Sequence, residues 1–240
     1  MSAPLIETRG LVKHFGGVQA IRGVDFTLAE GELRCLIGPN GAGKSTFFKL
    51  LTGQIKPTSG SVLFRGTDIT ALQAHEIARL GIGVKTQVPS VFNGLSVREN
   101  LWIAAARHRK GKAIVQAVEA QIERLMLGRV VDSVTGQLAH GQRQRVELGI
   151  VLCGEPSLIL LDEPAAGMTE EERGRTAEMI VEINRDHPLI VVEHDMAFIR
   201  SIARRITVFN QGTILMEGDV DEAFNSQAVR DVYLGKAVAA

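Results

Sequence analysis

The sequence from residue 38 to residue 45 reads Gly38-Pro39-Asn40-Gly41-Ala42-Gly43-Lys44-Ser45, and Thr46 follows it. It matches the pattern G-x-x-x-x-G-K-[ST], between the apolar segment 33–37, which predicts a strand, and a helical pattern over 46–52. Glycines in such a loop let backbone N–H groups turn toward phosphate oxygens, and the start of the helix adds positive potential. Lys44 supplies a charge and the Ser45 hydroxyl a Mg²⁺ ligand. The pattern therefore predicts a phosphate-binding P-loop, and the alternative is a glycine-rich turn that merely precedes a helix.

Apolar segments of strand length alternate with helical patterns on both sides of this loop, which predicts an α/β fold with a largely parallel sheet covered by helices. The predicted strands span residues 5–11, 19–28, 33–37, 81–85, 158–161, 189–192, 205–209 and 213–217. The last two flank Asn210-Gln211-Gly212, which predicts a hairpin turn. The hairpin and the two N-terminal strands predict antiparallel additions to the core.

The stretch from Ser96 to Cys153 is helical in pattern, which predicts a helical lobe inserted between two strands of the core. Residues 1–240 then form a single domain, with a core of approximately 1–87 and 154–240 and a lobe of approximately 88–153. Helix starts are predicted where a capping side chain is followed three residues later by Glu or Gln. These pairs are Thr70 with Gln73, Ser96 with Glu99, Thr169 with Glu172, and Asp219 with Glu222.

Composition argues against several classes of partner. Lysine plus arginine and aspartate plus glutamate both number 27, so no net charge draws the chain to nucleic acid or to an anionic surface. The longest apolar runs are far shorter than a bilayer span, and the N-terminus lacks the pattern of a secretory signal. Cys35 and Cys153 lie among apolar neighbours, which predicts buried thiols in a reducing compartment. We expect a cytosolic, soluble chain with no nucleic-acid partner.

Two carboxylates follow the predicted strand 158–161, in the sequence Asp162-Glu163-Pro164. A carboxylate at the end of a strand beside a P-loop is placed to hold Mg²⁺ through water, and a second one can orient or deprotonate an attacking water. The sequence therefore predicts the metal role for Asp162 and the catalytic role for Glu163. The alternative is an acidic turn that only ends a strand.

The segment Leu138-Ala139-His140-Gly141-Gln142 precedes a helical pattern over 143–153 and resembles the signature of the ABC ATPase family, usually Leu-Ser-Gly-Gly-Gln. The resemblance covers nearly the whole chain, with the motifs in family order. It implies an α/β P-loop NTPase core with antiparallel β additions and an inserted α-helical signature lobe. It also implies that Ala139, His140, Gly141 and Gln142 meet the γ-phosphate bound by the opposite subunit of a head-to-tail dimer.

Further residues match other positions of the family. Gln87 resembles the Q-loop glutamine, which contacts Mg²⁺ and links the core to the helical lobe, and His194 resembles the switch histidine, which senses the γ-phosphate. Phe15 lies where the family stacks an aromatic ring on adenine, and a place in the core is the alternative. The segment Ala165-Ala166-Gly167-Met168 occupies the position of the D-loop but departs from the usual Ser-Ala-Leu-Asp.

The resemblance implies an ATP-hydrolysing subunit of a membrane transporter, with ATP and Mg²⁺ as cofactors. Its expected partners are a second ATP-binding subunit, transmembrane permease subunits and, indirectly, a substrate-binding protein. The expected location is the inner face of the cell membrane, where the permease holds a cytoplasmic, peripheral subunit. The signature variant, the segment 165–168 and the ending Tyr233-Leu234-Gly235 resemble importers of branched-chain amino acids. The segments 32–35 and 81–87 also resemble the related importers of urea and short amides.

Three alternatives remain. An ABC exporter uses a similar ATPase subunit, because this subunit does not touch the cargo. A soluble ABC ATPase that acts on DNA or ribosomes usually has a long coiled-coil insertion or two ATPase domains, which this chain lacks. A P-loop kinase or GTPase predicts a base-specificity motif such as Asn-Lys-x-Asp, which does not occur, and no signature segment.

Overall fold

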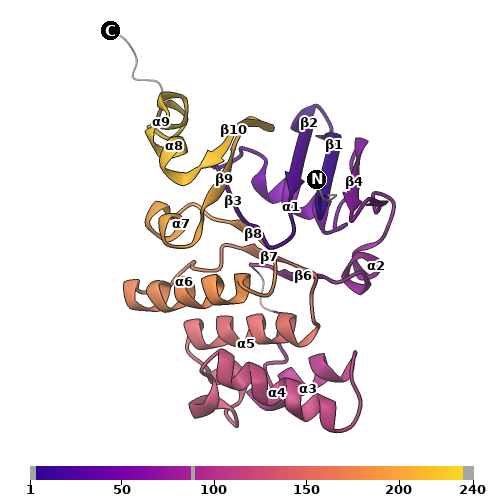
Figure 1. Ribbon diagram of the computed structural model, residues 1–240, viewed down its shortest axis with the longest axis vertical. Coiled ribbons are helices and arrows are strands. Elements are labelled where there is room, and N and C mark those ends of the chain that lie inside the picture. Colours follow the sequence, from indigo (N-terminus) through magenta and orange to yellow (C-terminus); the bar gives the residue numbers. More distant parts are fainter. Residues whose placement is uncertain (1–3, 88–89, 235–240) are drawn as a thin grey trace.

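The computed structural model describes residues 4–87 and 90–234, which form two sheets and a set of helices (Figure 1). In sheet order, the larger sheet consists of β10 (Thr213–Asp219), β9 (Arg205–Asn210), β3 (Leu33–Ile37), β8 (Leu189–Val192), β7 (Leu158–Asp162) and β6 (Ile82–Lys85). The smaller consists of β2 (Val18–Leu28), β1 (Ile6–Phe15), β4 (Ser59–Phe64) and β5 (Thr67–Asp68). The strands from β9 to β6 are parallel, whereas β10 and the smaller sheet pair antiparallel. The predicted α/β class with antiparallel additions is confirmed.

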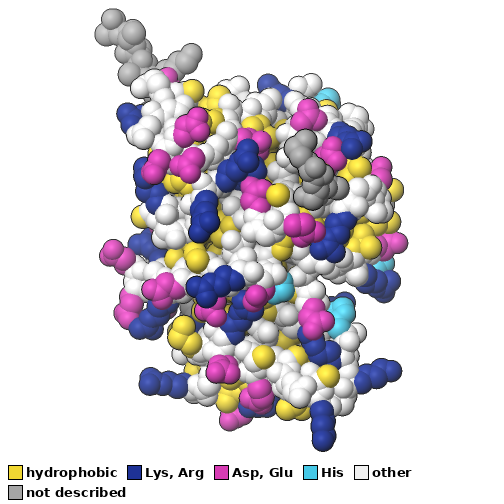
Figure 2. Space-filling view, viewed as in Figure 1, with side chains coloured by type: hydrophobic (Ala, Val, Ile, Leu, Met, Phe, Trp, Pro, Cys, Tyr) yellow, Lys and Arg dark blue, Asp and Glu magenta, His cyan; other side chains and the backbone are white. Residues whose placement is uncertain are grey.

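Helices connect and cover these strands. They are α1 (Lys44–Leu51), α2 (Ala74–Arg79), α3 (Val97–Ala106), α4 (Lys112–Arg124), α5 (His140–Cys153), α6 (Glu170–Asn184), α7 (Met196–Ile202), α8 (Val220–Asn225) and α9 (Gln227–Leu234). Single 3₁₀ turns occur at Gly128–Val130 and Thr135–Gln137. None of the helices within residues 4–87 and 90–234 combines the length and apolarity needed to cross a bilayer. On the face shown in Figure 2, positive and negative side chains are interspersed.

The central strands β3, β7 and β8 are buried along their whole length, because both faces of the larger sheet are covered. Side chains of a strand alternate between the two faces. In β7, Ile159 and Leu161 join the core formed with α5, α6 and α7, whereas Leu158 and Leu160 join the core formed with α1 and the smaller sheet. The larger sheet is therefore the middle layer, with one hydrophobic core on each of its two faces.

The helices α3, α4 and α5 lie together at one end of the molecule (Figure 1), between β6 and β7 in the sequence. Gly149 of α5 lets α3 approach closely: a Cβ there would lie 2.7 Å from Leu101 Cδ2 and 2.9 Å from Leu125 Cδ1. A side chain at this position would push the helices apart. The division of the chain into a core and a lobe at residues 88 and 153 stays a prediction.

Two of the predicted capping pairs are confirmed, since Ser96 with Glu99 and Thr169 with Glu172 form reciprocal capping boxes. The pair of Thr70 with Gln73 is wrong. The helix α2 begins one turn later, with Gln73 as its cap and Glu76 as the returning side chain, because the Thr70 hydroxyl accepts a hydrogen bond from Val62 N–H at 2.9 Å.

The last predicted pair is confirmed only in its first member. Asp219 caps α8 through the N–H of Asp221 at 2.9 Å, which replaces the expected reciprocal bond with Glu222. The predicted hairpin is present: Gln211 and Gly212 both have positive φ angles, 48° and 81°, as a two-residue turn of the I′ type requires.

Candidate nucleotide-binding site

The loop between β3 and α1 has a backbone that only glycine permits. Gly38 and Gly43 have φ angles of 145° and 109°. A Cβ at Gly38 would lie 2.3 Å from Phe209 O, and one at Gly43 would lie 2.8 Å from Ala20 O. Gly43 also caps α1 without a side-chain hydrogen bond, so the first N–H groups of the helix stay available to an anion.

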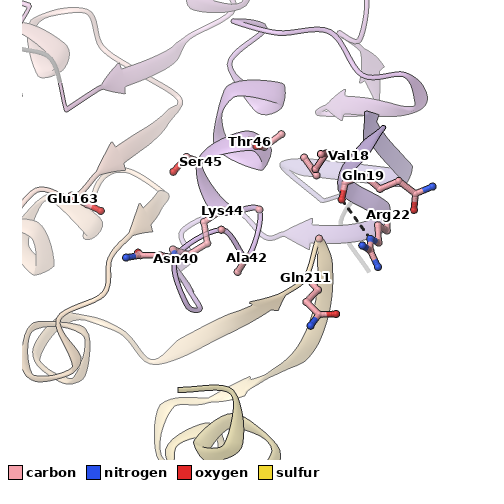
Figure 3. Close-up of a pocket in the computed structure, with 14 residues that line it drawn as sticks. Val18, Gln19, Arg22, Asn40, Ala42, Lys44, Ser45, Thr46, Glu163 and Gln211 are labelled. Carbon is pink, nitrogen blue, oxygen red and sulfur yellow. Dashed lines mark hydrogen bonds between the residues drawn. The ribbon is translucent and has the colours of Figure 1, made fainter. Parts of the chain in front are cut away.

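Beside this loop lies a cavity of about 380 Å³, within the size range of small-ligand sites. It is lined by Val18, Gln19, Ala20, Arg22, Asn40, Gly41, Ala42, Gly43, Lys44, Ser45, Thr46, Glu163, Gln211 and Gly212. Figure 3 shows Glu163 at one end of the cavity, Gln19 and Arg22 at the other, and Lys44 between them. The turn of the β9–β10 hairpin forms part of the cavity lining and is joined to the P-loop, because Gly212 N–H donates to Ala42 O at 2.9 Å.

Lys44 is almost entirely buried in the loop. Its Nζ donates to the carbonyl oxygens of Gly38 at 2.5 Å and of Pro39 at 3.0 Å. Burial lowers the pKa of Lys44, and the nearby carboxylates of Glu163 and Asp162 oppose that shift. Of the predicted P-loop residues, Gly38 and Pro39 do not line the cavity. They contribute to the site through their carbonyl oxygens, which accept hydrogen bonds from Lys44.

Asp162 ends β7 and is a buried carboxylate whose Oδ1 has no hydrogen-bond partner among the described residues. Burial raises its pKa, Glu163 raises it further, and Lys85 opposes the shift. An unpartnered buried carboxylate oxygen and the Ser45 hydroxyl are hard oxygen donors of the kind that Mg²⁺ prefers. Across the described ranges no group of three or more His, Cys, Asp or Glu is arranged to hold a metal. Mg²⁺ usually takes one or two protein oxygens together with substrate phosphates, and Ser45 and Asp162 would supply such oxygens.

The structure brings Glu163 and His194 together at the ends of β7 and β8. The Nδ1 of His194 lies 3.4 Å from Glu163 Oε1, and its ring is largely exposed. Glu163 has a φ of 47°, in the left-handed region that residues with a Cβ rarely adopt. Such backbone strain is typical of functional sites, where it aims a side chain in a direction that regular structure does not allow.

The four predicted signature residues lie elsewhere. Ala139 caps α5, and its N–H donates to Gln142 Oε1 at 3.1 Å. The exposed His140 places Nε2 3.0 Å from Ala166 O and 3.1 Å from Gln144 Nε2. None of Ala139, His140, Gly141 and Gln142 lines the cavity.

Gln87 and Phe15 also lie outside the cavity lining. Gln87 is exposed and follows β6, next to residues 88 and 89, which the structure does not describe. Phe15 is about half exposed, at 49%, so the alternative of a core position is wrong. It pairs across the β1–β2 turn with Val18, which does line the cavity, and Lys13 Nζ lies 5.1 Å from its ring centroid. Both cysteines are free and buried, as predicted.

Sequence reasoning missed several residues. Gln19, Arg22 and Gln211 reach the cavity from segments far from the P-loop, and no motif marks them. Glu193, at the end of β8, is buried and accepts hydrogen bonds from three backbone N–H groups. An acidic residue after the wholly apolar strand 189–192 repeats the pattern of Asp162 after 158–161, and this parallel was the available signal.

The parallel sheet, the glycine-locked loop and the carboxylates at the adjacent strand end define a P-loop nucleoside triphosphatase. A model of the ABC transporter family matches residues 21–166. The chain is 36% identical over 256 residues to the high-affinity branched-chain amino acid transport ATP-binding protein LivG of Salmonella typhimurium, covering 99% of this chain and all of the relative. The chain belongs to the ABC transporter family, as one of its ATPases.

Two further comparisons bear on its place in the family. The lipopolysaccharide export system ATP-binding protein LptB of Acidithiobacillus ferridurans is 33% identical, over 96% of this chain and 97% of the relative. A crystal structure of the ADP conformation of an ATP-binding cassette of an ABC transporter has a TM-score of 0.87 and 27% identity, covering 98% of this chain and 100% of that one. Subunits of a branched-chain amino acid transport system and of a lipopolysaccharide export system are thus both among its relatives.

Proposed function

We propose that this chain is the ATP-hydrolysing subunit of an ABC importer for branched-chain amino acids or for urea and short amides. The observation that carries the proposal is the similarity to LivG, which extends over essentially the whole length of both chains. The ATPase subunit does not contact the cargo, so the cargo assignment rests on this similarity and on the signature and D-loop variants at 139–140 and 165–168.

In the proposed reaction, the loop at 38–46 binds the triphosphate of ATP and Lys44 neutralises part of its charge. Bound Mg²⁺ would be held by Ser45 and Asp162, with Gln87 beside it, and would neutralise charge on the phosphates. Glu163 orients and deprotonates the attacking water. His194 holds Glu163 in place and contacts the γ-phosphate. The 3.4 Å separation of His194 Nδ1 and Glu163 Oε1 supports this pairing.

Phe15 is proposed to stack on adenine. Its exposure and its pairing with Val18 support this role, since a half-exposed ring can cover a base that enters the cavity beyond Lys44. The other residues at that end of the cavity, Gln19, Arg22 and Gln211, are then candidates for contacts with the base or the ribose.

The active assembly is proposed to be a head-to-tail dimer. Ala139–Gln142 do not line the cavity of their own chain, and Ala139 and His140 are exposed at the start of α5. A second copy, or a homologous subunit, would bring this helix start to the γ-phosphate, where backbone N–H groups and the helix dipole stabilise an anion. Each nucleotide would then lie between the P-loop of one subunit and the signature of the other.

The dimer is proposed to bind transmembrane permease subunits on the cytoplasmic face of the membrane, with a substrate-binding protein acting on the permease from the other side. Export, favoured by the similarity to LptB, is the second candidate. A soluble ABC ATPase unconnected with transport is the third, and it predicts that no membrane subunit binds this chain.

The test is reconstitution. The chain is co-expressed and co-purified with candidate permease subunits from the same organism, inserted into liposomes, and assayed for ATPase with a candidate binding protein loaded with leucine, valine, urea or acetamide. Stimulation and uptake with one of these loaded forms is the expected result. Stimulation by lipid or lipopolysaccharide without any binding protein would overturn import in favour of export, and failure of any membrane subunit to co-purify would overturn transport.

A further inference from the structure

The buried carboxylate of Glu193 joins two loops that follow different strands. Its Oε1 accepts a hydrogen bond from Ala165 N–H, after β7, at 3.1 Å. Its Oε2 accepts from His194 N–H at 3.0 Å and from Asp195 N–H at 3.4 Å, after β8. Only 2% of the residue is exposed, so water does not replace these bonds. One carboxylate therefore fixes the loop that carries His194 relative to the segment Ala165-Ala166-Gly167-Met168.

A carboxylate suits this place because it accepts with both oxygens. An amide of the same shape would turn one NH₂ group toward backbone N–H donors, and a donor facing a donor leaves both unsatisfied. A buried charge also needs an opposite charge nearby. Lys85, buried at the end of β6, supplies part of it: its ion pair is with Glu147 at 3.7 Å, and Glu193 is among the carboxylates that oppose the burial-driven lowering of the Lys85 pKa.

Each of the two joined loops leads to a functional position. On one side, His194 Nδ1 lies 3.4 Å from Glu163 Oε1. On the other, the carbonyl of Ala166, next to Ala165, lies 3.0 Å from the Nε2 of His140 at the start of α5. A continuous series of contacts thus runs from the signature helix through Ala165–Ala166 and Glu193 to the pair of His194 and Glu163.

We propose that Glu193 is a positioning residue for ATP hydrolysis, which holds His194 against Glu163 and makes their geometry depend on the position of the segment 165–168. This inference rests on the proposed roles of Glu163 and His194. In the proposed dimer the segment 165–168 and α5 face the other subunit, so Glu193 connects the surface that a partner contacts with the chain's own catalytic pair. Binding of ATP by the P-loop does not involve it.

Two substitutions separate positioning from simple support of the fold. Glu193→Gln removes the charge and introduces donors, and Glu193→Asp keeps the charge but is one methylene shorter, so it cannot reach both loops. Glu217→Gln is the matched control, because the Glu217 carboxylate accepts from the buried Arg34 and from Thr207 at 2.7 Å, remote from the cavity lining. All three variants are compared with the native chain in steady-state ATPase assays and in thermal unfolding.

We expect Glu193→Gln to lower kcat about tenfold with a KM for ATP within about twofold of the native value, because an interaction that matters only in the reacting complex is lost. The kcat of Glu193→Asp should lie between that of Glu193→Gln and that of the native chain. The control Glu217→Gln should lower the Tm by at least as much as Glu193→Gln while kcat stays unchanged. An unchanged kcat in Glu193→Gln overturns the inference. So does a fall in kcat in Glu217→Gln that matches the fall in Glu193→Gln for the same loss of Tm, because the effect would then be one of stability.

A double-mutant cycle tests whether Glu193 acts through His194. In a His194→Ala background, Glu193→Gln should lower kcat no further. A second, independent tenfold fall overturns the proposed route. The native chain is measured first with ATP: absence of hydrolysis there would refute the ATPase roles proposed above, whereas native hydrolysis with an insensitive Glu193→Gln refutes this inference alone.

Discussion

Two helix starts in this molecule are proposed to meet phosphate, and they differ in how much of a site surrounds them. The helix α1 begins at Lys44 beside a cavity of about 380 Å³, behind a loop that admits only glycine at Gly38 and Gly43. The helix α5 begins at His140 on an exposed surface, and its first residues line no part of that cavity. The first is a complete pocket within one chain. The second is proposed to become a binding surface only when another subunit covers it.

The difference has a physical reason. At α1 the loop lies so close to Phe209 O and Ala20 O that Gly38 and Gly43 have no room for a side chain, and residues of one chain alone line the pocket. At α5 the cap is half made, because the Ala139 methyl has no acceptor for the N–H of Gln142 while Gln142 accepts from Ala139 N–H. Substitutions near α1 should therefore affect each chain on its own, and those at the start of α5 should act through the dimer.

The largest effect is expected at the catalytic end of the first site. Glu163→Gln should lower hydrolysis by about two orders of magnitude or more, the scale of general-base catalysis, while ATP binding is retained. The trapped ATP should then hold a dimer, which light scattering with and without ATP would detect. Near-native turnover in Glu163→Gln contradicts the assignment of Glu163 as the base.

The second prediction concerns the contact between the part of the chain that carries α5 and the sheet that carries the P-loop. Lys85 of β6 and Glu147 of α5 are both buried, with 3.7 Å between Nζ and Oε2. Burial lowers the pKa of Lys85 and raises that of Glu147, and each opposes the shift in the other. Lys85→Met should lower the free energy of unfolding by about 3 kcal/mol, because the remaining carboxylate is buried without its partner.

The control for that prediction is the double variant Lys85→Met with Glu147→Leu, which removes both charges and should recover most of the loss. Urea denaturation of the three proteins measures the difference. Equal losses in the single and double variants would mean that volume, rather than unpaired charge, determines the stability at this contact.

The comparison also shows what the sequence could and could not predict. Most strands, the P-loop and the carboxylates at the end of β7 were predictable, because apolar runs and a spaced glycine motif are local signals. The strands β4 and β5 of the smaller sheet were missed. The sequence marks Glu193 only as an acidic residue after an apolar strand; its contacts, and the pair of Lys85 with Glu147, were not predictable, since they join elements far apart in the chain. The start of α2 was misplaced because Thr70 and Gln73 both begin an acceptable capping pattern, and the contact of Thr70 with β4 decides between them.

The third prediction returns to α1. Lys44→Ala should weaken ATP binding about tenfold to a hundredfold, the loss expected for a charged hydrogen-bond donor that faces phosphate. Isothermal titration with a non-hydrolysable ATP analogue measures the affinity. The Lys44→Met variant serves as a control that keeps much of the buried volume. If both variants bound the ATP analogue as tightly as the native chain does, the triphosphate would have to bind elsewhere.

The smallest effect is expected at the start of α5, where Ala139→Ser should do two separable things. The serine hydroxyl can accept from Gln142 N–H and complete the capping box, which should raise the free energy of unfolding by about 1 kcal/mol in the monomer. If Ala139 faces the γ-phosphate of another subunit, the hydroxyl can instead donate to that phosphate and tighten ATP-driven dimerisation a few-fold.

Ala139→Asp distinguishes the two effects, because aspartate caps a helix as well as serine does but places a negative charge toward the phosphate. Both variants should therefore be more stable than the native monomer, while only Ala139→Ser should dimerise more readily with ATP and Ala139→Asp should dimerise less. Both quantities are measured in the Glu163→Gln background, by urea denaturation without ATP and by light scattering with it. Equal dimerisation of the two variants would show that α5 does not begin at a nucleotide, whatever its cap contributes to stability.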